Sequence, residues 1–304
     1  MRIVVGLVWL LIGAGAQSLS LLHPCPETFT LIGRPQSDSD YAMAELQDQG
    51  ASLLLSPFLW NLRSAQGEAR LTCSSQGLSV QVSMRHFVKI QPQIDVGGYP
   101  GVMYGQELWF PFAAASQRVS WFHLPLPVDA LPPVRSTLAT QTFVHHGSIT
   151  DLSYDIWLTR NPKTRRLRFP DLELMIWFIH QGTLGPPFLH LGTLKEEVRW
   201  HHQPVPVSFA VYLLPHTGSA SGWVGIYLLA DQELVGTLTL PLTSMIQAIF
   251  PYLEQVFPQL TPQTYLLDAI QVGMEFNPDA QGQVDLGYTL RRWSLHLASS
   301  PTSE

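Results

Sequence analysis

Short runs of alternating or branched residues dominate this sequence. They include 78–82, 119–124, 172–178, 209–214 and 222–229, separated by proline, glycine, serine, asparagine or aspartate. A period of two is typical of β-strands. The runs recur roughly every 8–20 residues without helical patterns between them, which favours antiparallel sheets over strand–helix–strand units. The sequence therefore predicts an all-β fold, a jelly-roll β-sandwich of two antiparallel sheets.

One segment departs from this alternation. Apolar residues fall at helical spacing between 243 and 257, and Thr243 is placed to cap the first turn. Pro251 should kink or split that helix, because proline lacks the backbone N–H and clashes with the preceding turn. We therefore expect one α-helix in the chain.

Composition narrows the class further. Only 13% of the 304 residues are charged, and 24 are proline, which argues against a coiled coil, a charged helical bundle or a disordered tail. The net charge of −6 and the scattered arginines leave no basic stripe for nucleic acid. No repeat or linker divides the sequence, so a single domain over about 21–298 is expected.

The first residues form a separate unit. Met1 and Arg2 give a positive start, 3–12 is an apolar run, and 14–16 reads Ala-Gly-Ala, a cleavage pattern. This pattern is typical of a secretory signal peptide over 1–16. The alternative is a membrane anchor, but a span needs about 20 apolar residues. We expect secretion and no stable membrane anchor.

Export bears on the two cysteines. Oxidising compartments keep such pairs joined, so Cys25 and Cys73 are expected to form a disulfide. The alternative is two free buried thiols. In the chain-entropy model, closing a loop of this size contributes about 3–4 kcal/mol to stability.

Three predicted strands present polar groups opposite an apolar face. In 171–178 the even-numbered side chains are apolar, whereas the other face carries Glu173, Met175 and Trp177. A carboxylate beside a thioether and an indole suits the floor of a sugar-binding cleft, where aromatic planes stack on sugar rings.

The other two strands repeat this arrangement. The run 270–276 presents Glu275, and 153–158 presents Asp155 and Trp157. Two carboxyl groups flanking a glycosidic bond hydrolyse it with retention when about 5–5.5 Å apart, or with inversion at about 6.5–9.5 Å. The residues alone leave both routes open. For each acid, the alternative is an ordinary solvated strand face.

The sequence lacks the residue patterns of a metal site, a serine hydrolase and a phosphate-binding loop. The pairs His145-His146 and His201-His202 point to opposite faces of a strand and have no matching Cys or carboxylate spacing, so no metal is expected. No Gly-x-Ser-x-Gly elbow or phosphate-binding loop is present. We therefore expect no cofactor.

At its acidic strands the sequence resembles glycoside hydrolase family 12, the single-domain jelly-roll endoglucanases. The nucleophile pattern Glu-(Leu/Ile)-Met-Ile-Trp is reproduced at 173–177, and the acid/base segment Gly-x-Glu at 273–275. The Ser-Tyr-Asp-(Leu/Ile) strand, with an auxiliary carboxylate, is matched at 153–156. The resemblance implies that Glu173 is the nucleophile, Glu275 the acid/base and Asp155 the auxiliary acid.

Further segments are similar to the same family. These are Trp60 in an early Asn-x-Trp-like segment, a Tyr-Pro-x-x-x-Tyr-Gly segment at 99–105 that includes Tyr104, and Trp109 after it. Trp60, Trp109, Tyr104, Met175 and Trp177 are therefore expected to contact sugar. Three departures stand out, because Gly101 replaces an acidic residue, Phe58 an asparagine, and Met274 a threonine.

The resemblance implies retaining hydrolysis of internal β-1,4 bonds in cellulose or mixed-linkage β-glucan by a monomeric enzyme. A carboxylate pair formed by Asp155 and Glu173 would share a proton or hydrogen bond and favour mildly acidic activity. The alternatives are a xyloglucan-specific hydrolase of the same family and a jelly roll that binds carbohydrate without cleaving it.

Overall fold

The computed structural model describes residues 18–22, 25, 27–35, 42–48, 51–106, 122–163, 166–215 and 222–298. The predicted signal peptide lies outside these residues, as does the first half of the strand predicted at 119–124. The described half, 122–124, is not in a strand. Within the described ranges, no helix is long and apolar enough to cross a membrane.

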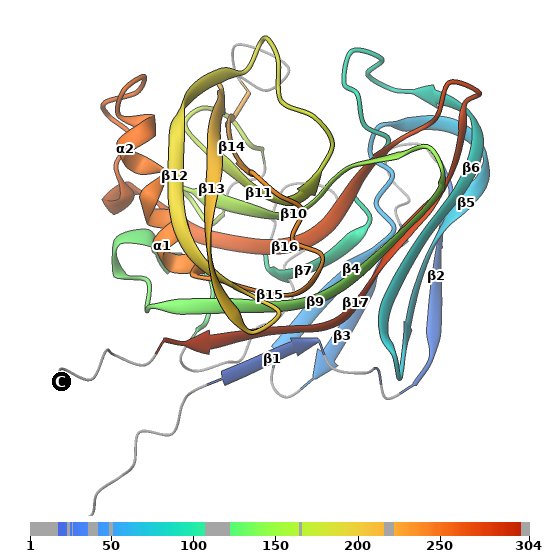
Figure 1. The fold of residues 1–304 in the computed structure, drawn as a ribbon, viewed down its shortest axis with the longest axis horizontal. Coiled ribbons are helices and arrows are strands. Elements are labelled where there is room, and N and C mark those ends of the chain that lie inside the picture. Colours follow the sequence, from blue (N-terminus) through green and yellow to red (C-terminus); the bar gives the residue numbers. More distant parts are fainter. Residues whose placement is uncertain are drawn as a thin grey trace, which may run out of the picture.

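Two layers of strands form the molecule (Figure 1). The inner layer curves around a concave face. Its strands follow in the order β3 (Ala44–Asp48), β4 (Ala51–Ser56), β7 (Gly101–Gly105), β16 (Leu266–Asn277), β10 (Ser148–Thr159), β11 (Leu172–His180), β14 (Val224–Ala230) and β13 (Gln203–Leu214). β8 (Leu126–Pro127) pairs with the start of β16.

The outer layer packs behind the inner one. Its order is β2 (Phe29–Gly33), β5 (Leu62–Ser74), β6 (Gly77–Lys89), β17 (Gln283–Leu297), β9 (Val134–His146) and β15 (Gly236–Leu240). β1 (Ser18–Leu22) pairs with the end of β17. β12 (Leu189–Trp200) joins the layers, since it pairs with β13 along its length and with β15 at its end.

The predicted all-β jelly-roll fold is confirmed by this arrangement. One pairing differs from the antiparallel expectation, because β11 and β14 run parallel. These strands are not consecutive, and the long hairpin of β12 and β13 lies between them in the chain. That detour brings the chain back to the same end of the sheet, as a parallel pair requires.

The predicted helix is split. α1 (Leu242–Ala248) and α2 (Phe250–Leu253) meet at Ile249, and Pro251 lies in the first turn of α2, where its missing N–H costs nothing. The expected capping role of Thr243 is wrong. Its hydroxyl instead donates to Pro132 O and accepts from Val134 N, which ties α1 to the start of β9. Two short 3₁₀ turns, η1 (Val128–Ala130) and η2 (Pro262–Thr264), complete the helical segments described.

The hydrophobic core lies between the two layers. The even-numbered apolar side chains of β11 are fully buried there, as the sequence predicted, and so are those of β10 and, from Ile270 onward, those of β16. Since the core takes one face of these strands, their other face is left for the concave side. The core thereby fixes which side chains can reach a substrate.

The predicted disulfide is present. Cys25 and Cys73 are bonded, with Cα atoms 5.6 Å apart and a sequence separation of 48. The bond joins the segment before β2 to the end of β5, and Cys25 N donates to Ser74 O beside it. It anchors the amino-terminal segment to the outer layer.

Candidate active site

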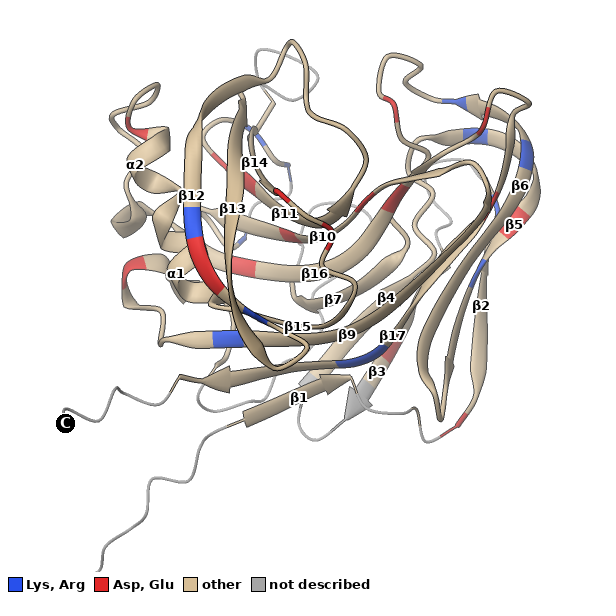
Figure 2. Ribbon diagram, viewed as in Figure 1, with Lys and Arg blue, Asp and Glu red and all other residues tan. Residues whose placement is uncertain are grey.

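Three adjacent strands bring the acidic residues to the concave face. β10 runs between β11 and β16, and it places Trp157 opposite Glu173 and Asp155 opposite both Met175 and Gln271. Figure 2 marks the acidic positions on these strands in red. Glu173 and Glu275 are both partly exposed, which suits groups that must meet a ligand. The charge of Glu173 helps to raise the pKa of Glu275, so the two carboxyl groups interact.

Two donors hold the Glu173 carboxylate. Trp223 Nε1 donates to Oε2 at 3.0 Å, and the Tyr227 hydroxyl donates to the same oxygen at 3.3 Å. Gly225 lies opposite Glu173 in the parallel pairing, and a Cβ there would lie 2.7 Å from the Tyr227 hydroxyl. The glycine therefore leaves the space through which Tyr227 reaches back to Glu173.

Burial and hydrogen bonding act in opposite directions on Glu173. Burial raises the pKa of its carboxyl, whereas the bonds from Trp223 and Tyr227 lower it. The two donors thus favour the ionised form of Glu173 in a site where burial disfavours charge. They also fix which oxygen remains free, because both bind Oε2.

Glu275 has an acidic neighbour that the sequence analysis missed. Asp151 lies opposite it in the β10–β16 pairing and is fully buried. Burial and the charge of Asp151 raise the pKa of Glu275 well above its usual range. Burial also raises the pKa of Asp151, to about 7, and the Ser153 hydroxyl donates to Asp151 Oδ1 at 2.7 Å.

Asp155 is buried nearer the middle of β10. Gln271 Nε2 donates to its Oδ2 at 3.4 Å. Asp155 and Glu173 lie on the same face, one step diagonally apart across β10 and β11. The proton sharing expected between Asp155 and Glu173 stays a prediction.

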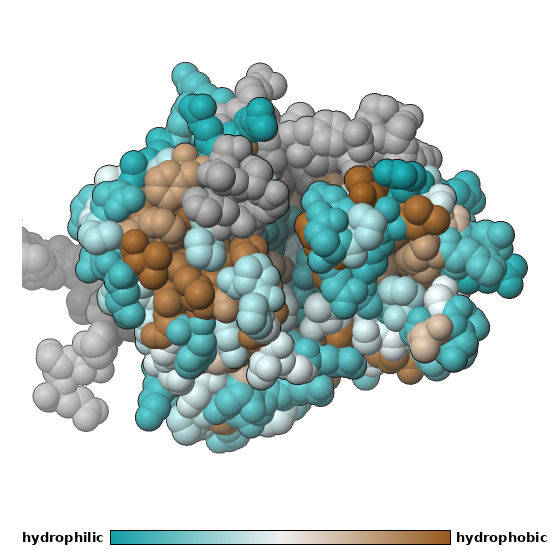
Figure 3. All heavy atoms as spheres, turned by 90° about the horizontal axis from the view of Figure 1, so that it is seen from above, coloured by the Kyte–Doolittle hydropathy of each residue, from teal (hydrophilic) through white to brown (hydrophobic). Residues whose placement is uncertain are grey.

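An aromatic cluster forms the floor between the acids. Its buried members are Tyr99, Met175, Trp177, Tyr227 and Leu229, and partly buried side chains around them include Phe58, Trp60, Phe188 and Tyr212. Seen from above, the surface is hollowed between two lobes, with apolar residues gathered beside the hollow (Figure 3). Trp177 Nε1 is buried without a hydrogen-bond partner among the described residues. The floor thus offers ring faces together with an unused donor.

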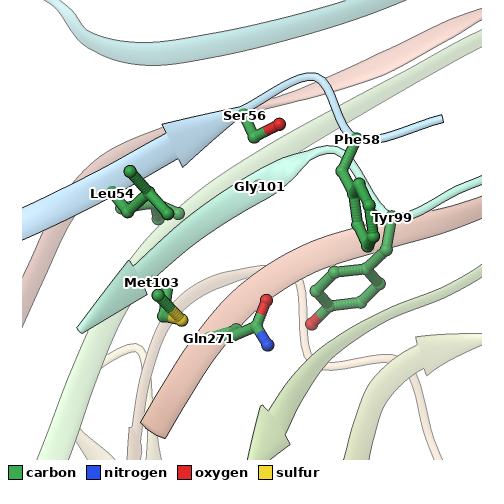
Figure 4. Close-up of a pocket in the computed structure, with 8 residues that line it drawn as sticks. Leu54, Ser56, Phe58, Tyr99, Gly101, Met103 and Gln271 are labelled. Atoms are coloured by element: carbon green, nitrogen blue, oxygen red, sulfur yellow. The ribbon is translucent and has the colours of Figure 1, made fainter. Parts of the chain in front are cut away.

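A small cavity adjoins Gln271, the residue whose side chain donates to Asp155. It has a volume of about 10 Å³, enough for one water molecule, and Phe58, Tyr99, Met103 and Gln271 surround it (Figure 4). Tyr99 lies against Gly273, where an added Cβ would be 2.5 Å from its ring. The Tyr99 hydroxyl donates to Ser153 O at 3.0 Å. Tyr99 therefore bridges the Gly-x-Glu segment of β16 and the acidic strand β10.

The residues predicted to contact sugar lie in different parts of the structure. Trp60, Met175 and Trp177 lie in or against the aromatic cluster on the concave face. The prediction for Tyr104 is wrong, because alternation along β7 turns its side chain into the core, where it is fully buried. Its hydroxyl donates there to Phe122 O. Trp109 lies outside the described residues.

Residues that sequence reasoning missed include Asp151, Trp223, Tyr227 and Tyr99. Asp151 could have been found, since extending the alternation of Ser153 and Asp155 by one step reaches it. Trp223 and Tyr227 gave no such signal, because their role depends on the pairing of β14 with β11.

The histidine pairs show no metal-site geometry. His201 and His202 form the turn between β12 and β13, both with positive φ, and His146 Nδ1 contacts Asp279 Oδ2 at 3.2 Å. In the part of the chain described here, no group of three His, Cys, Asp or Glu side chains is placed to hold a metal ion.

A curved jelly roll that carries two interacting glutamates beside an aromatic floor is an arrangement typical of glycoside hydrolases. The sequence model of glycosyl hydrolase family 12 matches residues 55–202. Over this part of its length the chain is similar to that family, and the likeness supports a glycoside hydrolase of the cellulase type. No curated protein sequence matches it.

Solved structures of family 12 share the fold. A family 12 xyloglucanase from Bacillus licheniformis is 13% identical with a TM-score of 0.60, over 88% of this chain and 98% of the xyloglucanase. An endoglucanase from Trichoderma harzianum is 18% identical with a TM-score of 0.57, over 89% of this chain and 97% of its own. An endoglucanase from Rhodothermus marinus is 15% identical with a TM-score of 0.57, over 88% and 97%.

Proposed function

We propose that the protein is a secreted, retaining endo-β-1,4-glucanase that cleaves cellulose or mixed-linkage β-glucan. The observation that carries the proposal is the different surroundings of the two glutamates. Glu173 accepts two hydrogen bonds that favour its carboxylate, whereas Glu275 faces acidic neighbours that favour its protonated form. A nucleophile and a general acid need these opposite states.

In the proposed reaction, Glu173 attacks the anomeric carbon while Glu275 protonates the departing glycosidic oxygen. The covalent glycosyl-enzyme that forms is then hydrolysed by a water from which Glu275, now ionised, removes the proton. Two inversions give net retention. The aromatic floor would orient the sugar rings by stacking, and Asp155 would tune Glu173 from the neighbouring strand.

Replacement of the two glutamates tests these roles. Glu173→Gln and Glu275→Gln should each lower hydrolysis of barley β-glucan and carboxymethylcellulose by at least ~10³-fold, with unchanged circular dichroism. Asp285→Asn, on β17 of the outer layer, is the matched control and should retain activity. Near-normal activity in either glutamate variant would contradict the assignment.

Azide separates nucleophile from acid/base with an activated aryl glucoside. In Glu173→Ala, azide should attack the anomeric carbon directly and yield the α-glycosyl azide. In Glu275→Ala, it should attack the glycosyl-enzyme and yield the β-azide. The opposite pattern would exchange the two roles, and proton NMR of the first wild-type product would report retention directly.

Substrate preference is tested with a panel of glucans. Larger kcat/KM on mixed-linkage glucan and cello-oligosaccharides than on xyloglucan would support the proposal, and the reverse would favour the xyloglucanase alternative. Binding of cello-oligosaccharides without release of reducing ends would indicate a non-catalytic jelly roll. Expression of the full chain with analysis of the culture medium and its amino terminus tests secretion and cleavage near Ala16.

A further inference from the structure

The buried carboxyl of Asp151 has no role in the reaction just described. It is fully buried in the middle of a sheet, where an unused acid would be costly. It lies opposite Glu275 across β10 and β16, and the charge of Asp151 raises the pKa of Glu275. Asp151 is therefore placed to act on the Glu275 carboxyl.

A strand irregularity puts Asp151 there. The β10–β16 register shifts between Ile149 and Asp151, so that Thr150 is the extra residue. Ile149 belongs to the core, yet Asp151, two residues later, lies on the concave face beside Glu275. Bulges re-aim side chains in this way and are common beside active sites.

Ser153 distinguishes the two carboxyl groups. Its hydroxyl donates to Asp151 Oδ1 at 2.7 Å, a contact that favours the ionised form of Asp151. The Ser153 hydroxyl thus assigns the ionised form to Asp151, while burial and the charge of Asp151 raise the pKa of Glu275. Glu275 therefore keeps its proton when Asp151 is ionised.

Other titratable groups face this pair from the surrounding strands. They are Glu173 and His180 on β11, Asp155 on β10, Tyr227 on β14 and Tyr99 before β7. The His180 ring is already engaged with the carbonyl oxygens of Gly182 and Ala230. Glu173 and Asp155 add negative charge, which also holds the proton on Glu275.

We propose that Asp151 is a positioning residue for the acid/base: it orients the Glu275 carboxyl across β10 and β16 and, as a carboxylate held by Ser153, keeps the catalytic proton on Glu275. The inference rests on the proposed function, since it assigns Glu275 the acid/base role. With Asp151 in this role, the general acid Glu275 is already protonated before substrate binds. The one proton that remains, on Glu275, stays there until the glycosidic oxygen accepts it.

The first test does not require turnover. Carboxyl-carbon NMR titration of the wild-type chain, labelled at Asp and Glu, should show two coupled steps for Asp151 and Glu275, with the upper step dominated by Glu275. In Asp151→Asn, Glu275 should titrate in one step whose midpoint is lower by about one pH unit or more. An unchanged midpoint would overturn the proposal.

The variant Ser153→Ala tests whether Asp151 or Glu275 is the ionised carboxyl of the pair. Loss of the hydroxyl should raise the lower step, which belongs to Asp151, and leave the upper step in place. Movement of the upper step alone would mean that Glu275 is the ionised member, and the proposal would be wrong. The wild-type titration and this variant remain informative even if Asp151→Asn does not fold.

Kinetics supply the second readout. In Asp151→Asn the alkaline limb of the kcat profile should move to lower pH by the same amount, with KM changed less than about twofold. Asp285→Asn should show the wild-type profile. A loss of activity at all pH values with an unmoved limb would indicate a structural role only. If the wild-type chain hydrolyses no glucan, the proposed function fails while the titration still decides the pairing.

Discussion

At the scale of single residues, the hydroxyl of Tyr227 shows how much of the site depends on one contact. It donates to the Glu173 oxygen that Trp223 also binds, and it lowers the pKa of a carboxyl that burial raises. Removing a hydrogen bond to a charged group typically costs about 1.5–3 kcal/mol. The contact therefore bears on both the orientation and the ionisation of the proposed nucleophile.

Tyr227→Phe should lower kcat by about 10–100-fold with little change in KM. Because the lost bond had lowered the pKa of Glu173, the acidic limb of the kcat profile should move to higher pH. Initial rates across pH measure both effects. Tyr252→Phe, which loses a hydroxyl bonded to Thr193 O outside the cleft, is the matched control. An acidic limb unmoved in Tyr227→Phe would show that the contact does not govern ionisation.

Alternation alone predicted which side chains of β10, β11 and β16 face the concave side. Glu173, Asp155 and Glu275 follow from counting along each strand, because the core fixes the other face. The pairing of Asp151 with Glu275 does not follow, since it depends on a bulge at Thr150. Counting along one strand gives the face of a side chain, but only the register gives its neighbour.

At the scale of elements, the close approach of β7, β16 and the Tyr99 segment explains two glycines. Gly101 pairs with Gly273, and a Cβ on Gly101 would lie 2.4 Å from Val272 O. A side chain at 101 would separate the two strands, so the glycine that departs from the family's acidic residue is required by packing here. Gly273 likewise makes room for the Tyr99 ring.

Gly273→Ala should therefore displace Tyr99 and break its bond to Ser153. We expect a loss of about 1–3 kcal/mol in unfolding free energy, as for an overpacked interior, with reduced activity because Glu275 is two residues away. Urea unfolding measures the first effect. Gly185→Ala, where an added Cβ meets nothing within 4 Å, should leave the unfolding free energy nearly unchanged. Equal stability of the two variants would refute the packing argument.

The helix shows which local features the sequence predicts and which depend on tertiary contacts. The position of Pro251 predicts the break in the helix, and the structure has it. The position of Thr243 predicts a cap, but its hydroxyl instead bonds to Pro132 O and Val134 N. Local sequence signals a residue that can cap, and tertiary contacts decide whether it does. The same holds for Tyr104, whose motif suggested a ligand while its strand position turned it inward.

For the whole molecule, the sandwich buries several acids whose charge it disfavours. Burial raises the pKa of Asp268 to about 6 and that of Asp151 to about 7, and it also raises those of Glu173 and Glu275. Glu68 and Asp279 have lowered pKa values, so their contribution to stability is lost only as the pH falls towards and below their ordinary range. Above pH ~4 the buried acids dominate.

The sign follows from proton binding. Between the ordinary pKa of a carboxyl and its raised value in the fold, the folded chain binds more protons than the unfolded chain, so the free energy of unfolding falls as the pH rises. We expect it to fall from about pH 4 to about pH 7, in a window set by Asp268 and Asp151. For Asp268 alone, a rise from 3.8 to about 6 corresponds to ~3 kcal/mol.

Asp268→Asn tests this directly. Asn keeps an oxygen that can accept from the Thr159 hydroxyl, which lies 3.1 Å from Asp268 Oδ2, but it cannot ionise. Urea unfolding at successive pH values should show a shallower decline between pH ~4 and ~6 than in wild type, and higher stability near pH 7. Asp129→Asn, at an exposed carboxyl in η1, should keep the wild-type decline. A wild-type stability that rises over this range would mean that ionised acids in the sandwich are better compensated than their burial implies.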